Sequence, residues 1–410
     1  MFSVRSKTLA LLLLGLLAAT GCQSSVPSPA DQSAGNTAPS AADPAPSQTP
    51  ATPSDAGKDS HLPSSPDSTT DGRNQGSSAA SLGTPTAMRL ASASSGWIGG
   101  DGWIARTDDG GRSWQTQWSG QEAISQIFAL NGKQAWAETE SANLLRTTDG
   151  GQHWSVAGKA PNSGFLHFVS ADRAFAANAA TADGGKSWDA LPVPQNIVGD
   201  AYFHDEKNGW AVIQNNGMGI VQRTQDGGKT WKTVMGRKLA APLNGALIRS
   251  VGPDDAWVEW VGDSGMSQTS YSLFHTSDGG KSWQTVVANS TAGGGPAPGF
   301  PLEYNGGPKN QGSKPGPLYV VDRKTAYMGG DCPACDKPNT VGKTTDGGKT
   351  WVNEPAAYPG YAGAILGMAD AKNGWWVCTD NEKASVMYTT SDGGEHWKKT
   401  HEFPAPGKSS

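Results

Sequence analysis

Cysteine, charge of one sign and long apolar runs are all scarce in this sequence of 410 residues. The formal net charge is only −5, and the basic residues form no stripe, which argues against a nucleic-acid partner. Four cysteines are too few for a disulfide scaffold, and a chain of this length can bury a large core without one. Glycine (54), proline (27) and tryptophan (16) are plentiful instead, which favours a mostly β structure with many tight turns.

The longest apolar stretch runs from Leu9 to Ala19 and follows Arg5 and Lys7. It is too short to span a bilayer, so it predicts a cleaved signal peptide over residues 1–21. The small residues before Cys22 resemble a bacterial lipobox, although Ala19 stands where leucine is commoner. That resemblance implies lipidation of Cys22 and a stable anchor on the extracytoplasmic face of a bacterial membrane. The alternative is an ordinary secretory signal.

Residues 22–86 consist mainly of Ser, Ala, Pro, Thr, Gly and Asp, almost without large apolar side chains. Such a segment cannot bury enough surface to fold, so we expect a disordered linker between the membrane and the globular part. The globular part is expected over residues 87–404, and residues 405–410 form a short tail.

An eight-residue repeat, here called the box, organises the globular part. It begins with Thr, has Asp two residues later, continues with Gly-Gly and ends in Trp. It occurs seven times, at residues 107–114, 147–154, 181–188, 224–231, 276–283, 344–351 and 390–397. A repeat of this strictness predicts a repeat architecture.

Each box lies within the same succession of four short β-prone segments bounded by turn residues. The second segment always carries an aromatic residue at its start: Trp97, Trp136, Phe175, Trp210, Trp257, Tyr327 and Trp375. Four strands repeated seven times predict an all-β fold, a seven-bladed β-propeller of four-stranded antiparallel blades, expected as a monomer. The last repeat ends on its own fourth strand, so packing between the first and last blades should close the ring.

The box falls at the turn between the third and fourth strands, and its residue types suit a structural role. Adjacent glycines allow positive φ, and the aspartate can accept hydrogen bonds from its own turn. The tryptophan can fill the space between blades while its indole N–H finds a partner. We therefore assign a structural role, without metal or cofactor, to Asp109, Asp149, Asp183, Asp226, Asp278, Asp346 and Asp392.

The boxes resemble the Asp-box, or BNR, repeat of sialidases, xyloglucanase-type glycoside hydrolases and sortilin-type receptors. The fuller pattern most resembles the photosystem II stability/assembly factor-like propellers, many of which are bacterial lipoproteins. The resemblance covers residues 88–403. It implies the propeller fold and a protein-binding role in assembly, but one propeller hosts many activities.

The sequence departs from two enzyme families that share the box. A sialidase needs three converging arginines, and its Phe/Tyr-Arg-Ile-Pro motif is replaced here by PTAMRLASAS. Aligning the inner strands eight residues before the second-strand aromatic gives a ring of Arg89, Phe128, His167, Tyr202, Arg249, Tyr319 and Gly367. Only two arginines and no acid occupy it. Xyloglucanase-type enzymes use a cleft between two propellers, and this chain has one.

The same ring supplies candidates for a central channel, namely Arg89, His167 and Arg249. Polar packing between blades is the simpler explanation. A second candidate surface is the rim opposite the boxes, where long loops gather in repeats five to seven. Its candidates are Glu259, Trp260, Asp263, Tyr271, Tyr304, Asp331, Asp336 and Asp380. A neutral, disordered insertion at residues 288–317 is the alternative there.

Cys332 and Cys335 form a CxxC pair, for which a local disulfide suits an extracytoplasmic compartment. A zinc site or a redox pair is the alternative, but no second ligand pair or βαβ context accompanies it. Cys378 is expected to be a buried free thiol, or else a partner for one of this pair. Taken together, the sequence predicts a lipid-anchored, non-enzymatic propeller that binds another extracytoplasmic or membrane protein. The alternative is a secreted glycan-acting enzyme or glycan binder of the sialidase-like class.

Overall fold

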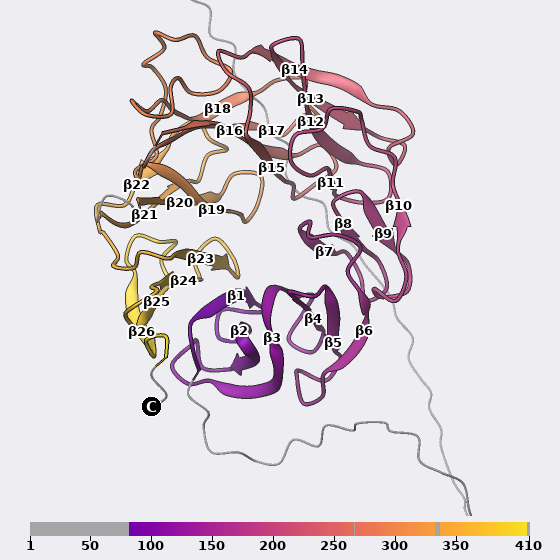
Figure 1. Ribbon diagram of the computed structural model, residues 1–410, viewed down its shortest axis with the longest axis vertical. Coiled ribbons are helices and arrows are strands. Elements are labelled where there is room, and N and C mark those ends of the chain that lie inside the picture. The colour runs from indigo at the N-terminus through magenta and orange to yellow at the C-terminus, as the bar shows by residue number, and fades with distance from the viewer. Residues whose placement is uncertain (1–81, 266, 333–336, 408–410) are drawn as a thin grey trace, which may run out of the picture. The chain divides into compact units, whose positions relative to one another are not determined.

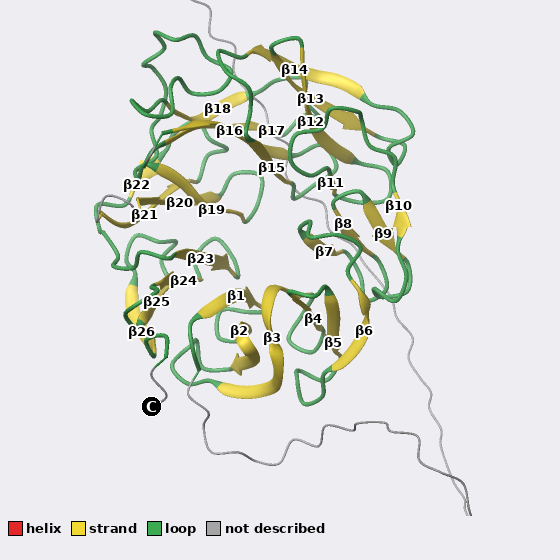
Figure 2. Ribbon diagram, in the orientation of Figure 1, coloured by secondary structure: helices red, strands yellow, loops and turns green. Residues whose placement is uncertain are grey.

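The computed structural model describes residues 82–407, except residue 266 and residues 333–336. The predicted signal peptide, Cys22, nearly all of the predicted linker, and Cys335 and Asp336 lie outside this part of the chain. Within it, the chain forms strands and loops without helices (Figure 2). Accordingly, none of the described residues form a helix long and apolar enough to cross a membrane.

The strands form an all-β propeller of antiparallel sheets (Figure 1). One sheet has six strands: β1 (Pro85–Leu90), β2 (Gly96–Thr107), β3 (Gln115–Ala129), β4 (Ala135–Thr139), β5 (Asn143–Thr147) and β6 (Ser155–Lys159). The next is formed by β7 (Leu166–Phe168), β8 (Ala174–Ala176), β9 (Ala179–Thr181) and β10 (Asp189–Ala190). It is followed by β11 (Tyr202–Phe203), β12 (Gly209–Asn215), β13 (Met218–Thr224) and β14 (Lys232–Lys238).

The remaining three sheets each hold one repeat. They consist of β15 (Gly245–Arg249), β16 (Ala256–Ser264), β17 (Thr269–Thr276) and β18 (Gln284–Asn289); of β19 (Lys314–Val320), β20 (Ala326–Cys332), β21 (Lys337–Thr344) and β22 (Val352–Asn353); and of β23 (Gly363–Met368), β24 (Gly374–Thr379), β25 (Ser385–Thr390) and β26 (Lys398–Phe403). The described chain thus has six sheets, and the predicted count of seven blades is corrected to six.

The difference in count arises in the six-stranded sheet, which contains the first two repeats. The first part of β2 pairs with β1, and its second part pairs with β3. The strand β3 in turn pairs with β2 through Gln115–Ala123 and with β4 through Ile124–Ala129. Because β3 runs without a break from one repeat into the next, two repeats share one sheet. Seven boxes are therefore distributed over six sheets.

Packing between the first and last repeats closes the ring, as predicted. Trp375 in β24 packs edge-to-face on Trp114 of the first box, with ring centroids 5.8 Å apart. The same kind of contact joins Trp97 to the second box (6.5 Å) and Trp210 to the fifth (6.2 Å). A shared apolar cluster around Met88 in β1 and Val377 in β24 completes the junction. The closing contact therefore repeats one used elsewhere around the propeller.

The boxes are self-contained turns. In the third box, Thr181 Oγ1 donates to Asp183 Oδ1 (2.7 Å) and accepts from the N–H of Gly185 (3.0 Å). The Ser187 N–H and hydroxyl donate to the two oxygens of Asp183, at 3.0 and 2.6 Å. Gly184 and Gly185 have φ of 79° and 97°, which residues with a Cβ rarely adopt. These bonds, which favour the ionised carboxylate, lower the pKa of Asp183.

The prediction for the box indoles holds for only part of the set. Three box indoles donate a hydrogen bond. Trp231 donates to Pro192 O (3.3 Å) and Trp283 to Val234 O (3.2 Å). Trp351 donates to Asn310 Oδ1 (3.2 Å). The other four have no hydrogen-bond partner among the described residues: Trp114, Trp154, Trp188 and Trp397. Partial burial of the tryptophan ring, and not a hydrogen bond from its N–H, is what the boxes share.

Candidate functional site

The inner strands of the sheets surround a cavity of about 940 Å³. In the ribbon view, β1, β7, β15, β19 and β23 are among the strands nearest the middle of the ring of sheets (Figure 1). Each residue of the predicted ring pairs with the second-strand aromatic eight residues later, from Arg89 with Trp97 to Gly367 with Trp375. The eight-residue offset in the sequence therefore corresponds to the residue pairing between the first and second strands of each repeat.

Six of the seven ring residues line this cavity: Arg89, Phe128, His167, Tyr202, Arg249 and Tyr319. Arg89, His167 and Arg249, the candidates for a central channel, are among these lining residues. The cavity also reaches residues that the sequence did not single out, including Gln126, Phe165 and Asp200. Gln126 in β3 and Phe165 just before β7 each precede a ring residue by two positions, so extending the alignment by two residues would have found them.

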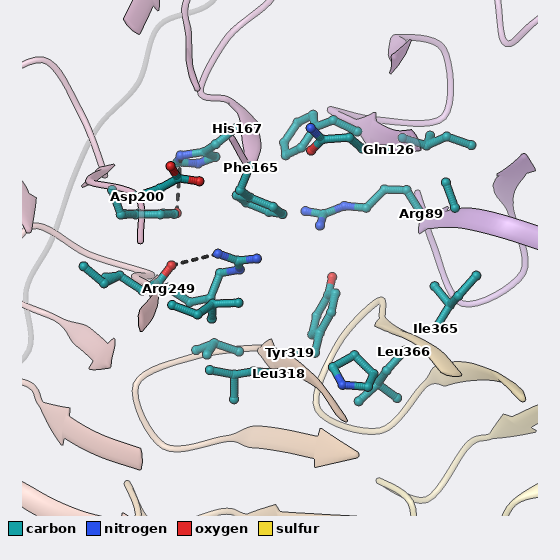
Figure 3. Close-up of a pocket in the computed structure, with 18 of the residues that line it drawn as sticks. Arg89, Gln126, Phe165, His167, Asp200, Arg249, Leu318, Tyr319, Ile365 and Leu366 are labelled. Atoms are coloured by element: carbon teal, nitrogen blue, oxygen red, sulfur yellow. Dashed lines mark hydrogen bonds between the residues drawn. The ribbon is translucent and has the colours of Figure 1, made fainter. Parts of the chain in front are cut away.

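Arg89 and Arg249 both point into the cavity from different repeats (Figure 3). The Arg89 guanidinium lies over the ring of Phe128, 4.7 Å from its centroid, and 5.7 Å from that of Tyr319. The Arg249 guanidinium lies 3.8 Å from the centroid of Phe165. Cation–π contacts of this kind hold a guanidinium in place without neutralising its charge.

Neither guanidinium forms an ion pair with any carboxylate in the described part of the chain. Arg249 Nη1 donates to the carbonyl oxygen of Ile248 at 2.8 Å. Burial lowers the pKa of Arg249 to about 10, an effect partly opposed by the negative potential of Glu259 and Asp200. A pKa of about 10 still leaves Arg249 charged at neutral pH, so a positive charge without an ion-pair partner among the described residues faces the cavity.

His167 and Tyr202 complete one wall of the cavity. Their polar atoms, His167 Nδ1 and Tyr202 Oη, are 3.3 Å apart, and Tyr202 also donates to Ser250 O at 3.1 Å. Burial, together with the nearby His204 and Arg89, lowers the pKa of His167 to about 4. Burial raises the pKa of Tyr202 to about 12. Both groups are therefore neutral at physiological pH, so that among the ring residues the charge comes from Arg89 and Arg249.

Of the rim candidates, three lie in the protein interior. Trp260 and Tyr271 are fully buried, and Glu259 is 4% exposed. Tyr271 accepts hydrogen bonds from Asn289 and Asn310 between two sheets. Burial raises the pKa of Glu259 to about 7, although Arg249 opposes the shift. These residues support the fold at this rim and do not form a surface.

The other described rim candidates are dispersed. Asp263 is exposed, and Asp380 is 6% exposed and accepts from the N–H groups of Glu382 and Lys383. Asp331 is half-buried, and its Oδ1 has no hydrogen-bond partner among the described residues. Tyr304 stacks on Phe300, with centroids 4.2 Å apart. The structure does not gather these residues into one site.

The excursion between the fifth and sixth repeats is packed against the propeller. Ala297 is fully buried, and Phe300 is 8% exposed within the cluster that contains Trp260 and Phe274. The guanidinium of Arg237 lies 4.8 Å from the ring of Phe274 and 5.1 Å from that of Phe300. The excursion is thus a structural cover on this rim, which the alternative of a disordered insertion did not anticipate.

The thiol of Cys378 is buried and free, as predicted, and burial raises its pKa. The side chain of Cys332 lies outside the described part, as does Cys335, so their pairing stays a prediction. The described residues contain no group of three His, Cys, Asp or Glu side chains that could hold a metal ion.

No protein-family profile and no curated protein matches this sequence. Among solved structures, YCF48 from Cyanidioschyzon merolae is 16% identical, with a TM-score of 0.47 over 76% of this chain and 94% of that one. YCF48 bound to a D1 peptide is 16% identical, with a TM-score of 0.43 over 76% of this chain and 91% of that one. The GH74 enzyme of Niastella koreensis is 12% identical, with a TM-score of 0.35 over 78% of this chain and 66% of that one. These likenesses are too weak to carry an argument about function.

Proposed function

We propose that this propeller is a non-enzymatic module that binds an acidic segment of a protein partner in its central cavity. The observation that carries the proposal is the pair Arg89 and Arg249. Both point into the cavity, and neither has a carboxylate partner in the described structure. Removing a guanidinium from water without pairing it with an opposite charge costs free energy. Binding of an anion would offset that cost.

The chemistry of the pair suits a carboxylate. Guanidinium groups form paired, charge-assisted hydrogen bonds with carboxylates, and these are stronger where water is limited. The neutral His167 and Tyr202 offer further polar contacts without competing for the anion's charge. The cavity of about 940 Å³ has the volume of a small-ligand site, so it would take a few side chains of a partner and not a folded domain.

The alternative is a glycan-acting enzyme or a glycan binder, for which buried carboxyl groups with raised pKa values would be the supporting feature. Glu259 has such a pKa but does not line the cavity. Glu138 does line it, and burial raises its pKa although the hydrogen bond from Gln126 Nε2 at 2.7 Å opposes the shift. One such carboxyl lacks the second, paired carboxylate that glycoside hydrolysis normally uses. Sugar sites also present free aromatic faces. Here guanidinium groups cover the faces of Phe128 and Phe165. The arrangement favours a peptide carboxylate.

The proposal includes attachment to the extracytoplasmic face of a membrane through a lipidated Cys22, supported by the apolar stretch and the small residues before that cysteine. Expression of the full chain and of Cys22→Ser with labelled palmitate tests this part. We expect label in the wild type and none in the variant. Equal labelling of both would reject lipidation at Cys22.

Binding can be tested by selecting random octapeptides against the purified full chain. We expect enrichment of Asp or Glu, lost in the Arg89→Gln/Arg249→Gln double variant and partly restored by Arg89→Lys/Arg249→Lys. Arg173→Gln is the matched control, because Arg173 pairs with Glu206 at the surface. Selection of neutral peptides, or enrichment that survives the double glutamine variant, would overturn the proposal. Selection of acidic glycans but not peptides from a parallel array would favour the alternative.

A further inference from the structure

The central cavity extends outward on one side of the propeller. In most repeats it is lined only by the inner strand and the residues next to it. In the second and third repeats, the lining also includes residues of the second strand or just after it: Glu138, Thr139 and Glu140 at the end of β4, and Phe175 and Ala177 at β8. The cavity therefore opens sideways over these two repeats.

The length of the third repeat explains this opening. Its β8 and β9 have three residues each, whereas the neighbouring β12 and β13 have seven each. Four residues of strand correspond to about 13 Å, so the third sheet ends well short of its neighbour on the side opposite the boxes. This sheet lies between the six-stranded sheet and β11–β14 (Figure 1). Asn162 caps its hairpin by donating to Ala176 O at 3.1 Å.

The charge changes sign along this opening. Arg89 and Arg249 supply positive charge at the level of the ring. Glu140 and Asp200 line the opening, are exposed, and form no ion pair with any described residue (Figure 3 shows Asp200). Asp200 lies two residues from Tyr202 of the ring, and Glu140 lies four residues from Trp136, which pairs with the ring. At the rise of an extended chain, the backbone of the two acidic residues is thus offset by about 7–13 Å from the level of the ring. The Asp200 carboxylate still acts on Arg249, whose pKa it raises.

We infer that the partner is an extended peptide that leaves the cavity sideways over the third repeat, with charges of both signs. Its acidic residue lies between Arg89 and Arg249, an assignment that rests on the proposed function. A Lys or Arg about two to four positions away faces Glu140 and Asp200, because an extended chain advances about 3.3 Å per residue. A polypeptide supplies opposite charges at this spacing along one flexible chain, which fits the observed charge pattern.

The inference is tested with the octapeptide selection by reversing the charge of the opening. Glu140→Lys/Asp200→Lys changes two exposed side chains and leaves the arginines intact. The matched control is Glu382→Lys, which changes an exposed acid that does not line the cavity. We expect peptides selected by the wild type to carry Lys or Arg about two to four positions from the acid, and we expect the double variant to reduce that preference at least about tenfold. The control should leave it unchanged.

The two proposals fail in different ways. If the selected peptides keep their acid but show no basic neighbour, or if charge reversal leaves the preference unchanged, the sideways path is wrong and the arginine site stands. If the acid itself is not selected, both proposals fail. A melting temperature near that of the wild type confirms that the double lysine variant is folded, so that a lost preference reflects the opening.

Discussion

His275 and Asp255 form a buried pair, with Nε2 and Oδ2 2.9 Å apart and side chains that are 5% and 0% exposed. The other ring nitrogen, Nδ1, lies 2.9 Å from the carbonyl oxygen of Gly347 in the next box. Each ring nitrogen of His275 thus has its own polar partner. His275 therefore connects the fifth repeat to the sixth.

The same connection recurs with other basic side chains in the position just before the box threonine. Arg106 Nη1 lies 3.4 Å from Gly150 O, Arg223 Nη1 3.2 Å from Gly279 O, and Lys343 Nζ 2.8 Å from Gly393 O. In each case the acceptor is the first glycine of the next box. The boxes thus act between repeats as well as within their own turns, because the carbonyl oxygen of the first box glycine accepts a hydrogen bond from a basic side chain of the preceding repeat.

The first prediction concerns this connection. Asp255→Asn should lower the free energy of unfolding by about 1–3 kcal/mol, because it removes the carboxylate that pairs with a buried imidazole. Asp254→Asn is the matched control: Asp254 is 52% exposed and pairs with Arg223, so its loss should cost less than about 1 kcal/mol. Urea unfolding of both variants measures the difference. Equal costs would show that the buried pair does not stabilise the junction.

The second prediction concerns acid. Hydrogen bonds from the Thr230 hydroxyl, the Thr230 N–H and the Thr224 hydroxyl lower the pKa of Asp226 from 3.8 to about 2. A lowered folded-state pKa stabilises the protein above pH 3.8, and this contribution is lost as the pH falls toward about 2. Asp226→Asn should therefore flatten the dependence of unfolding free energy on pH across this range. An unchanged slope in pH-dependent urea titrations would contradict the assignment.

The third prediction has the opposite sign. Burial raises the pKa of Glu259 from 4.5 to about 7, so the unfolded chain ionises first and stability falls as the pH rises between these values. Glu259→Gln should remove this loss. The unfolding free energy of the variant should therefore rise relative to that of the wild type by about 3 kcal/mol as the pH goes from 4.5 to 7. Glu382→Gln is the surface control. Parallel stability curves for wild type and Glu259→Gln would show that Glu259 ionises as freely when folded as when unfolded.

The register of the inner ring could be predicted from the sequence because a bonded antiparallel pair fixes which residues lie opposite. Arg89 faces Trp97 and Arg249 faces Trp257, as the eight-residue offset required. The predicted number of blades was wrong because the sequence does not show where a strand ends. One strand, β3, continues through the connection between the first two repeats.

The rim candidates were harder to place for a related reason. A strand in a propeller is covered on both faces by its neighbours, so alternation of residue types does not separate inside from outside. Trp260 and Glu259 are adjacent in β16, point to opposite faces, and are both buried. The sideways opening, by contrast, could have been predicted from the short span between Phe175 and its box.

The fourth prediction concerns the excursion at residues 290–313. Phe300→Ala should cost about 3 kcal/mol, because Phe300 is 8% exposed and stacks on Phe274 and Tyr304. Leu302→Ala, at 74% exposure two residues later, should change stability by less than about 0.5 kcal/mol. Thermal and urea unfolding compare the two. Similar small effects would show that the excursion does not support the propeller.

The central claim is that the cavity receives an acidic segment of a polypeptide between Arg89 and Arg249. A photoreactive phenylalanine in place of Tyr319, which lines the cavity beside Arg89, tests it most directly in cells that express the full chain. We predict a crosslink to a protein within a few residues of an Asp or Glu, and its loss when Arg89 and Arg249 are both changed to Gln. A crosslink to a neutral segment, a crosslink that survives the loss of both arginines, or none at all would contradict the claim.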